Sequence, residues 1–386
     1  MTVDKDSLQQ YFNDDHQMLR DSAQKFIAKH ISPFIAEWEE QESFPRELYP
    51  LAGEAGFLGI GYPESLGGSG EGDLFMKVAF SEEIMRSTSG GLVAGLGSLD
   101  IALPPIVNWA PEALKQRVVP EVLSGEKIAA LAITEPGGGS DVANLKTRAV
   151  REGDFYRVNG SKTFITSGVR ADYYTVAVRT GGEGYQGISL LLIEKGTPGF
   201  TVGKSLKKTG WRASDTAELF FEDCLVPVDN LIGQENAGFI CIMNNFLKER
   251  LMLTIMGYMT AQIALEESLA YVKEREAFGR PIGKFQVTRH KLVDMATEID
   301  IAREYTYRAA AKMQAGQYPI KEISMAKNFA TGVAERVTYQ AVQIFGGMGY
   351  MRETVVERLS RDARLLAIGG GTTEIMKEMI AKQMGL

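Results

Sequence analysis

Helical periodicity marks the first part of the chain. Apolar residues stand at i, i+4, i+7 and i+8 at Leu19, Ala23, Phe26 and Ile27. This spacing predicts an amphipathic helix over residues 14–40. More helices are expected over 44–123, interrupted by a glycine-rich turn at 67–72. Residues 1–130 are therefore predicted to form an all-helical domain.

The pattern changes after residue 130, where β-prone runs replace the helical spacing. Asn159-Gly160 stands between two such runs, 155–158 and 161–166, and an Asn-Gly pair is the strongest short signal for a hairpin turn. Further strands are predicted over 173–178, 188–193 and 217–221. Residues 131–233 are therefore predicted to form a β domain.

The helical period returns in the last third of the chain. One set of apolar residues lies at i, i+3, i+4, i+7 and i+11, at Met252, Ile255, Met256, Met259 and Ile263. A second set on another long helix comprises Leu292, Met295, Ala296 and Ile299. Helices are also predicted over 323–345, ended by Gly346-Gly347, and over 372–382. Residues 234–386 are thus predicted to form a helical bundle, and the fold class is α+β.

Composition and charge exclude several classes of protein. The 386 residues are 45% apolar with a formal charge of −7, which argues against general affinity for nucleic acid or an anionic membrane. The helix candidate over 246–265 carries Lys248, Glu249 and Arg250 in its first turns and so fails as a membrane span. Cys224 and Cys241 lack metal-ligand spacing, three histidines are too few for a histidine-rich metal site, and no targeting segment stands out. A cytoplasmic protein without a metal is expected.

The densest motif is LAITEPGGGSD at 131–141. Its consecutive glycines let the backbone approach a ligand closely, and Thr134, Ser140 and Asp141 add hydrogen-bonding side chains. Taken alone, such a loop is more often a turn, and it does not match the dinucleotide fingerprint.

Considered together, several motifs resemble the acyl-CoA dehydrogenase family of flavoproteins. They are LAITEPGGGSD at 131–141, KTFITSG at 162–168, ASDTAELFFED at 213–223, EREAFGRPIGKFQ at 274–286, QIFGGMGY at 343–350 and RDARLLAIGGGTTEIM at 361–376. They keep the family's order and spacing over essentially the whole chain. The resemblance implies a helical N-terminal domain, a central β-barrel or sandwich domain and a C-terminal four-helix bundle. It also implies FAD held between domains and between subunits of a homotetramer, a dimer of dimers.

The resemblance assigns roles to three groups of residues. Those expected to line the flavin and the acyl thioester are Leu131, Ile133, Thr134, Gly139 and Ser140, with Phe164, Ile165 and Thr166 against the isoalloxazine ring and Arg250 toward the substrate. Those expected to reach FAD in a neighbouring subunit are Arg275, Phe278, Gly279, Gln286, Gln343, Gly346 and Gly347. Further cofactor-contacting positions are Gly371, Thr372 and Glu374. Without the resemblance, Phe164 would be a hydrophobic strand residue and Arg275 a solvated helix residue.

The catalytic base is the most informative position. In many relatives a Glu follows Tyr in a Tyr-Glu-Gly-Thr motif, but Gly370 stands at that place here. A subgroup that includes long-chain and isovaleryl enzymes carries the base on a bundle helix, and Glu249 in Leu-Lys-Glu-Arg-Leu matches it. The resemblance therefore implies Glu249 as base. Its alternative is an exposed first-turn residue favoured by the helix dipole, and Glu374 is the second candidate base.

The resemblance implies oxidation of an acyl-CoA thioester to the trans-2-enoyl-CoA, with electrons passed to an electron-transfer flavoprotein. The acyl group is expected to be medium-chain, long-chain or branched, in fatty-acid or branched-acyl catabolism. A same-fold oxidase or flavin monooxygenase is the first alternative, and a non-catalytic acyl-CoA or flavin-binding relative is the second. Leu99, Ile101 and Gly90-Gly91 are candidates for the floor of the acyl cavity. The basic cluster Lys204, Lys207, Lys208 and Arg212 is expected to be a solvated turn rather than a CoA phosphate site.

Overall fold

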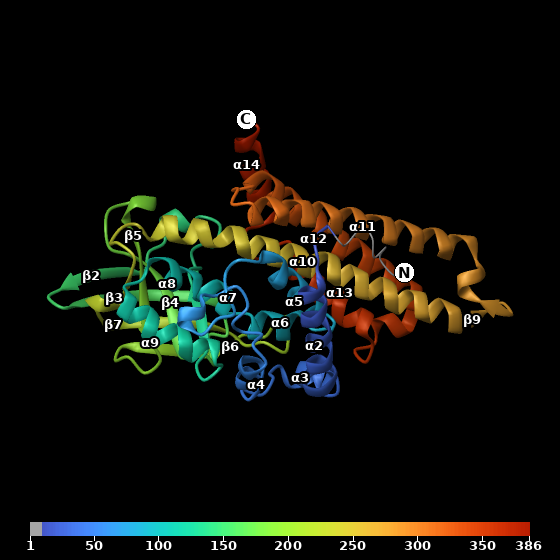
Figure 1. Cartoon of the computed structure of the whole chain (residues 1–386), viewed down its shortest axis with the longest axis horizontal. Helices are drawn as coiled ribbons and strands as arrows, with labels where there is room; N and C mark the ends of the chain where they lie inside the picture. Colours follow the sequence, from blue (N-terminus) through green and yellow to red (C-terminus); the bar gives the residue numbers. More distant parts are fainter. Residues whose placement is uncertain (1–9) are drawn as a thin grey trace.

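The computed structural model describes residues 10–386 and shows helices, then a sheet, then helices again (Figure 1). The N-terminal helices are α2 (Asp14–His30), α3 (Ile35–Gln41), α4 (Leu48–Glu54), α5 (Leu74–Met85), α6 (Gly90–Leu96), α7 (Leu99–Ala102), α8 (Pro104–Trp109) and α9 (Glu112–Leu123). The helix predicted over 14–40 is thus two helices, α2 and α3. Pro33, which lacks a backbone N–H, lies in the break between them.

The strands form a mixed sheet. They are β1 (Ala129–Ala132), β2 (Arg148–Glu152), β3 (Phe155–Thr166), β4 (Tyr173–Arg179), β5 (Ile188–Glu194), β6 (Phe200–Ser205), β7 (Thr216–Pro227) and β8 (Leu231–Ile232). Their order is β6-β7-β3-β2-β4-β5-β8, and β1 pairs in parallel with β4. The predicted strands over 173–178, 188–193 and 217–221 are confirmed as β4, β5 and part of β7.

The predicted hairpin turn at Asn159-Gly160 is wrong. Both residues lie inside β3, which runs antiparallel to β7 with a register shift between Val158 and Gly160. The Asn159 side chain accepts a hydrogen bond from the Asp223 backbone on β7 at 2.9 Å. A Cβ on Gly160 would lie 2.7 Å from the Thr147 Cα, so this glycine permits a close backbone approach rather than a turn.

Long helices form the C-terminal region. They are α10 (Gly238–Glu274), α11 (Gln286–Gln314), α12 (Ile320–Phe345), α13 (Val355–Leu366) and α14 (Thr373–Gln383), with the short ribbon β9 (Glu276–Ala277) and β10 (Arg280–Pro281) between α10 and α11. Helix α12 packs against each of the other four long helices. Helix α10 starts at Gly238, so Glu249 lies about three turns inside it. The prediction that Glu249 stands in the first turns of its helix is therefore wrong.

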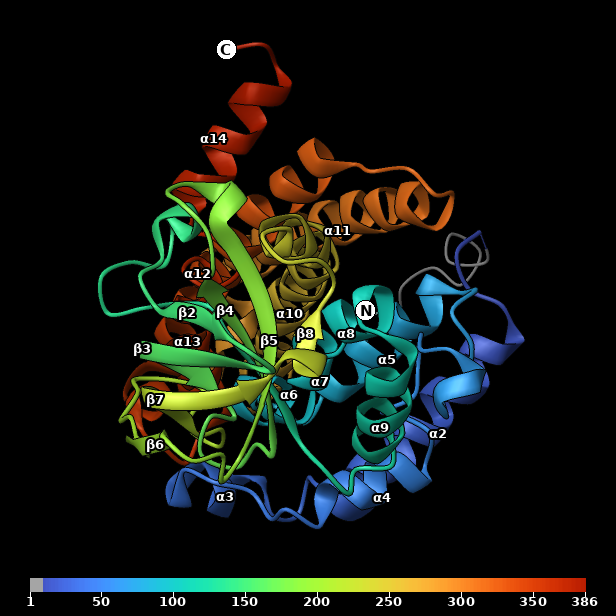
Figure 2. The same ribbon diagram turned by 90° about the vertical axis from the view of Figure 1, so that its left-hand side faces the viewer.

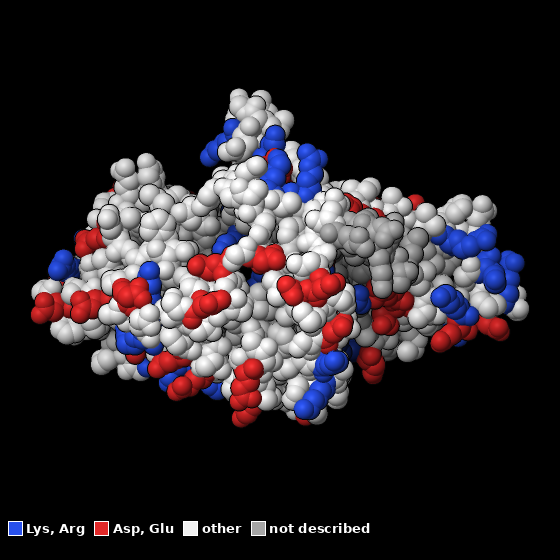
Figure 3. All heavy atoms as spheres, viewed as in Figure 1, with Lys and Arg blue, Asp and Glu red and all other residues white. Residues whose placement is uncertain are grey.

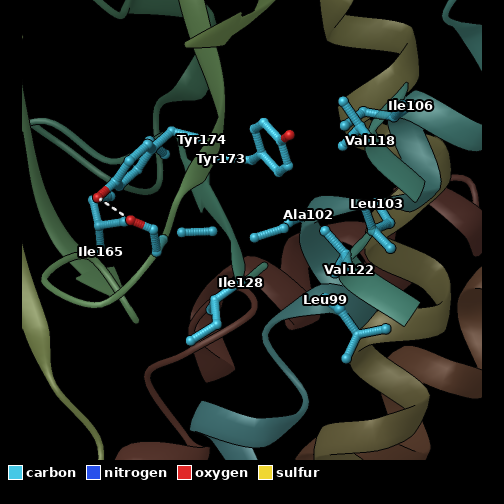
Figure 4. Close-up of a cluster of buried hydrophobic side chains, with 14 of the residues drawn as sticks. Leu99, Ala102, Leu103, Ile106, Val118, Val122, Ile128, Ile165, Tyr173 and Tyr174 are labelled. Atoms are coloured by element: carbon cyan, nitrogen blue, oxygen red, sulfur yellow. Dashed lines mark hydrogen bonds between the residues drawn. The ribbon is translucent and has the colours of Figure 1, made fainter. Parts of the chain in front are cut away.

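A shared apolar core joins the N-terminal helices to the sheet. Figure 2 shows α7, α8 and α9 beside the edge of the sheet formed by β5 and β8. Figure 4 shows side chains from both regions meeting in this core, with Leu103 from the bend between α7 and α8, Ile106 from α8 and Tyr174 from β4. All three are fully or almost fully buried. The sheet and the helices that flank the site are therefore held together by one hydrophobic cluster.

Within residues 10–386, no single helix is long and apolar enough to cross a membrane. One bent pair, Gly90–Leu96 with Leu99–Trp109, passes the same test of length and composition at a bend of 50°.

Candidate active site

A cavity of ≈ 1300 Å³ lies where the three regions meet. The N-terminal helices contribute residues of α5 and α7, the sheet contributes β1 and β3, and α10 crosses from the bundle. Sequence-predicted site residues that line it are Leu131, Ile133, Thr134, Gly139, Ser140, Phe164, Ile165, Thr166, Glu249, Arg250, Gly371 and Thr372. Leu99 and Ile101 also line it. The structure therefore brings together residues that are more than 200 positions apart in the chain.

The sheet side of the cavity presents hydroxyls and one aromatic face. Thr134 follows the end of β1, and its carbonyl accepts a hydrogen bond from the Thr163 backbone at 2.9 Å, which fixes the glycine-rich loop against β3. Phe164 has a φ of 60° and is 68% exposed. A left-handed backbone at a bulky aromatic residue is unusual and is typical of a position held for function. Phe164 therefore offers an exposed aromatic face two residues before Thr166 on β3.

A buried ion pair supports this wall, and sequence analysis missed it. The Lys162 ammonium is fully buried and donates to the Ile133 carbonyl at 3.1 Å and to Glu135 Oε1 at 2.8 Å. Glu135 also accepts from the backbone amides of Lys146 and Thr147 at 2.6 and 2.8 Å. Burial lowers the pKa of Lys162 to about 8, against the opposing effect of Glu135. The pair links the glycine-rich loop to β3 on either side of Thr134.

Glu249 is the unusual carboxylate of the cavity. Its Oε2 is buried and has no hydrogen-bond partner among residues 10–386. Burial raises the pKa of Glu249 to about 7, while Arg250 and Lys327 act in the opposite direction. A carboxyl group with a pKa near neutrality and a free lone pair is suited to take and release a proton. The alternative of an exposed, dipole-stabilised first-turn residue does not fit this burial.

Two buried cations surround Glu249. Arg250 donates from Nε to the Gly370 carbonyl at 3.2 Å, and Lys327 donates from Nζ to the carbonyls of Leu366 and Gly371 at 3.2 and 2.8 Å. Burial, together with Arg250, lowers the pKa of Lys327 to about 8. These donors fix the 369–372 loop beside the carboxylate. Lys327 was not predicted as a site residue.

Gly370 directly faces Glu249. A Cβ on Gly370 would lie 3.4 Å from Glu249 Oε1 and 2.4 Å from Leu253 Cδ1. The glycine has a φ of +63°, which side chains rarely adopt. A carboxylate carried by either position 249 or position 370 would therefore start beside the same point. This proximity gives a spatial reason for the pattern inferred from the sequence, in which the glutamate is missing at position 370 and present at position 249.

The prediction that the basic cluster of Lys204, Lys207, Lys208 and Arg212 forms a solvated turn is only partly correct. Lys207 and Arg212 both pair with Glu42, and Lys207 also lines the cavity. Lys208 lines the cavity as well and donates from Nζ to the Ser214 carbonyl and the Thr216 hydroxyl at 2.6 and 2.9 Å. The interpretation of Lys208 as part of a solvated turn is therefore wrong.

Gly90 and Gly91 do not line the cavity as the sequence had suggested. They pack against Trp211: a Cβ on Gly90 would lie 2.5 Å from its indole nitrogen, and one on Gly91 would lie 2.6 Å from its backbone carbonyl carbon. Trp211 itself lines the cavity. The two glycines therefore lie behind Trp211, on the side of this residue away from the cavity, and let it pack closely against α6.

A second group of predicted residues lies away from the cavity. Its members are Arg275, Phe278, Gly279, Gln286, Gln343, Gly346 and Gly347, all exposed. Tyr271 stacks on Phe345 with ring centroids 4.1 Å apart, which brings the 275–286 segment beside the turn at Gly346. In Figure 1 the short ribbon that contains β9, within this segment, lies at the opposite end of the molecule from the large sheet. Figure 3 shows Lys and Arg atoms gathered at that end.

Glu374 lies in the first turn of α14, is exposed, and is not among the cavity residues. Hydrogen bonds from its own backbone and from the Thr372 side chain hold the pKa of Glu374 below its ordinary value. It therefore lacks the burial that suits Glu249 to act as a base.

Three family models match successive parts of the chain. Residues 13–126 match the acyl-CoA dehydrogenase N-terminal domain, 130–224 the middle domain and 236–385 the C-terminal domain. The long-chain specific acyl-CoA dehydrogenase of Rattus norvegicus is 38% identical over 98% of this chain and 88% of that protein. The isovaleryl-CoA dehydrogenase of Oryza sativa subsp. japonica is 36% identical over 97% and 92%. The crystal structure of a probable acyl-CoA dehydrogenase from Mycobacterium abscessus is 51% identical with a TM-score of 0.95, covering 97% of this chain and all of that one.

The fold, the cavity and these matches define an FAD-dependent oxidoreductase. More narrowly, the chain belongs to the acyl-CoA dehydrogenase family. Members of this family are FAD flavoproteins, and the described residues fit that cofactor. The exposed face of Phe164 is an apolar surface for a flat ring, and Gly137 and Gly138 have open space where side chains would stand. The resemblance inferred from the sequence, and the fold it implied, are confirmed.

Proposed function

We propose that this enzyme removes the α-proton of an acyl-CoA thioester with Glu249 while the β-carbon is oxidised, giving the trans-2-enoyl-CoA. One observation carries this proposal: the unpaired Oε2 of Glu249 lies buried in a cavity that is also lined by Phe164 and Thr166. An unsatisfied buried carboxylate oxygen is costly, and such groups cluster at functional sites.

The residues around Glu249 control its proton. Oε2 accepts the α-proton, and a pKa of about 7 lets the carboxylate be ionised before the reaction and protonated after it. Arg250 and Lys327 favour the ionised form, and their hydrogen bonds to the 369–372 loop fix that loop against the carboxylate. The buried side chain of Leu253, one turn further along α10, lies on the same side as the carboxylate and makes this part of its surroundings apolar.

The sheet wall orients the substrate and the cofactor. FAD, when bound, supplies the acceptor for the hydride that leaves the β-carbon. Phe164 and Ile165 would lie against its ring system, and the Thr166 hydroxyl would donate a hydrogen bond toward it. Thr134 and Ser140 present hydroxyls and backbone amides to the thioester end of the substrate.

We assign the distant 275–286 segment to the cofactor site of a neighbouring subunit in a homotetramer, built as a dimer of dimers. Its position at the far end of the molecule and the 96% exposure of Phe278 support this assignment. An Arg beside a diphosphate provides a planar fork of donors, which suits Arg275. Gln343, Gly346 and Gly347 belong to the same surface, while Glu374 and Thr372 contact the cofactor from α14.

The acyl group in this proposal is medium-chain, long-chain or branched, and the electrons pass to an electron-transfer flavoprotein. Relatives at similar identity are named for both long-chain and isovaleryl substrates, so identity alone does not choose between these acyl groups. The proposed location is the cytoplasm, in keeping with the unpaired, buried state of Cys224 and Cys241.

The test is anaerobic bleaching of the purified yellow protein by straight and methyl-branched acyl-CoAs. The proposal expects bleaching by at least one class, formation of the 2-enoyl product and slow reaction of the reduced protein with oxygen. Rapid stoichiometric peroxide formation would identify a same-fold oxidase instead. Protein that binds FAD and acyl-CoA but never bleaches would be a non-catalytic relative.

A further inference from the structure

The cavity continues from Glu249 toward the N-terminal helices along a defined path. Met252 lies one turn from Glu249 on the same side of α10, and its sulfur is 3.2 Å from the Ser81 hydroxyl on α5. Ser81 and Lys77 are one turn apart on α5, and both line the cavity. The intervening wall is largely apolar and includes Phe80, an ordinary surface for an acyl chain.

This path ends on an ion pair rather than on hydrocarbon. Lys77 Nζ lies 2.8 Å from Asp100 Oδ2, and the two side chains are only 13% and 22% exposed. The Tyr62 hydroxyl lies 3.4 Å from the other Asp100 oxygen. Partial burial of two charges is costly, and the methyl end of a plain acyl chain does not compensate for it. The far end of the cavity is therefore built for a polar group.

The surrounding charges select among polar groups. Glu71 and Asp73 also line the cavity, but the Asp73 carboxylate accepts from the Phe75 amide and lies 3.0 Å from His16 Nε2, so Asp100 is the carboxylate that pairs with Lys77. An anionic group at the end of the chain would meet the like charge of Asp100. A neutral hydroxyl can accept a hydrogen bond from Lys77 and donate one to Asp100 at the same time. Figure 3 shows a hollow near the middle of this face, with acidic atoms on both sides.

We infer that the preferred substrate is an acyl-CoA whose acyl group carries a neutral hydrogen-bonding group, such as a hydroxyl, at its distal end, held by Lys77 and Asp100. This inference rests on the proposed function, because it identifies the substrate class of the same cavity. It places selection for the acyl end on α5 and α7, away from the residues that carry out the oxidation.

The test compares rates of anaerobic bleaching by acyl-CoAs that differ only at the terminal carbon. Methyl, hydroxyl and carboxylate ends are compared over a range of chain lengths. At the best length, the hydroxyl form is expected to exceed the methyl form by about 10-fold or more in kcat/KM, mainly through KM, because it makes hydrogen bonds to charged groups. The carboxylate form is expected to be the poorest of the three.

Two double variants isolate the pair. Lys77→Met with Asp100→Leu removes both charges together, so no uncompensated charge is left, and should reverse the preference toward the methyl end. Lys77→Gln with Asp100→Asn keeps a donor and an acceptor and should retain a preference for hydroxyl. Equal or better use of methyl-ended or carboxylate-ended substrates by the unmodified enzyme at every length would overturn the inference. Absence of bleaching by every acyl-CoA would instead overturn the proposed function.

Discussion

Replacing Lys327 with Met should move the pH dependence of flavin reduction to higher pH. Glu249 Oε1 and Lys327 Cε lie 3.4 and 3.7 Å from the point where a Gly370 Cβ would stand. The two atoms are therefore at most 7.1 Å apart, the sum of these distances. Because the pKa of Lys327 is about 8, its side chain is mostly charged at neutral pH and stabilises the ionised carboxylate.

The size of the shift follows from this separation. Two unit charges about 7 Å apart at an effective dielectric constant of about 20 interact by about 2 kcal/mol, or about 1.5 pKa units. Loss of the cation removes this stabilisation, so the pKa of Glu249 should rise from about 7 toward about 8.5. At pH 7 the ionised fraction, and with it the rate, should fall by about 15-fold. At high pH the difference should largely disappear.

The assay is stopped-flow reduction of the flavin at low acyl-CoA concentration over a range of pH, which reports kcat/KM and the pKa of the free enzyme. The wild-type rate should rise with pH through about 7. Lys327→Arg keeps the charge and the hydrogen-bond donors, so its profile should stay close to that of the wild type. An unshifted profile in Lys327→Met, with an equal loss of rate at every pH, would refute the electrostatic reasoning and leave Lys327 a role only in fixing the loop.

Three further changes test other parts of the site. Thr166→Val should slow reduction and lower the flavin potential by the loss of one charge-assisted hydrogen bond, on the order of 1.5–3 kcal/mol, and unchanged values would show that the hydroxyl points elsewhere. Arg275→Ala should lower FAD content and weaken the tetramer together, as measured by absorbance and analytical ultracentrifugation. A dilute monomer that keeps stoichiometric FAD would contradict this assignment. Gly370→Ala should lower the free energy of unfolding by about 1–2 kcal/mol, because alanine rarely adopts the left-handed backbone at this position, and the close contact with Leu253 should lower it further. An unchanged urea midpoint would count against this strain.

Sequence motifs predicted the family and many of the residues that line the cavity better than they predicted local structure. The motif predicts Glu249 as the base, and burial with a raised pKa fits that prediction. The Asn159-Gly160 pair gave the wrong local structure because a glycine that permits close backbone approach has the same sequence signal as a glycine in a turn. Only the pairing of β3 with β7, more than 50 residues later, distinguishes the two.

The supporting lysines Lys162 and Lys327 were missed because a lysine is normally placed in solvent. Lys327 carried a usable signal: with Ile323, Ala330 and Ala334 it falls at i, i+4, i+7 and i+11, on the apolar side of α12, and all four are buried. A charged residue inside an apolar stripe indicates a paired or functional group. Lys162 on β3 carried no such signal. Its partner Glu135 lies outside the helices and named strands, so no regular spacing in the sequence connects the two residues.

Single-turnover flavin reduction by Glu249→Gln tests the central claim most directly. Gln keeps the size and polarity of the side chain but cannot accept the α-proton, so the variant should bind FAD and acyl-CoA while its reduction rate falls by ~10² or more. Glu54→Gln, which changes an exposed carboxylate on α4 outside the cavity, is the control and should reduce at close to the wild-type rate. Reduction of Glu249→Gln at the wild-type rate would contradict the account and place the base on another residue.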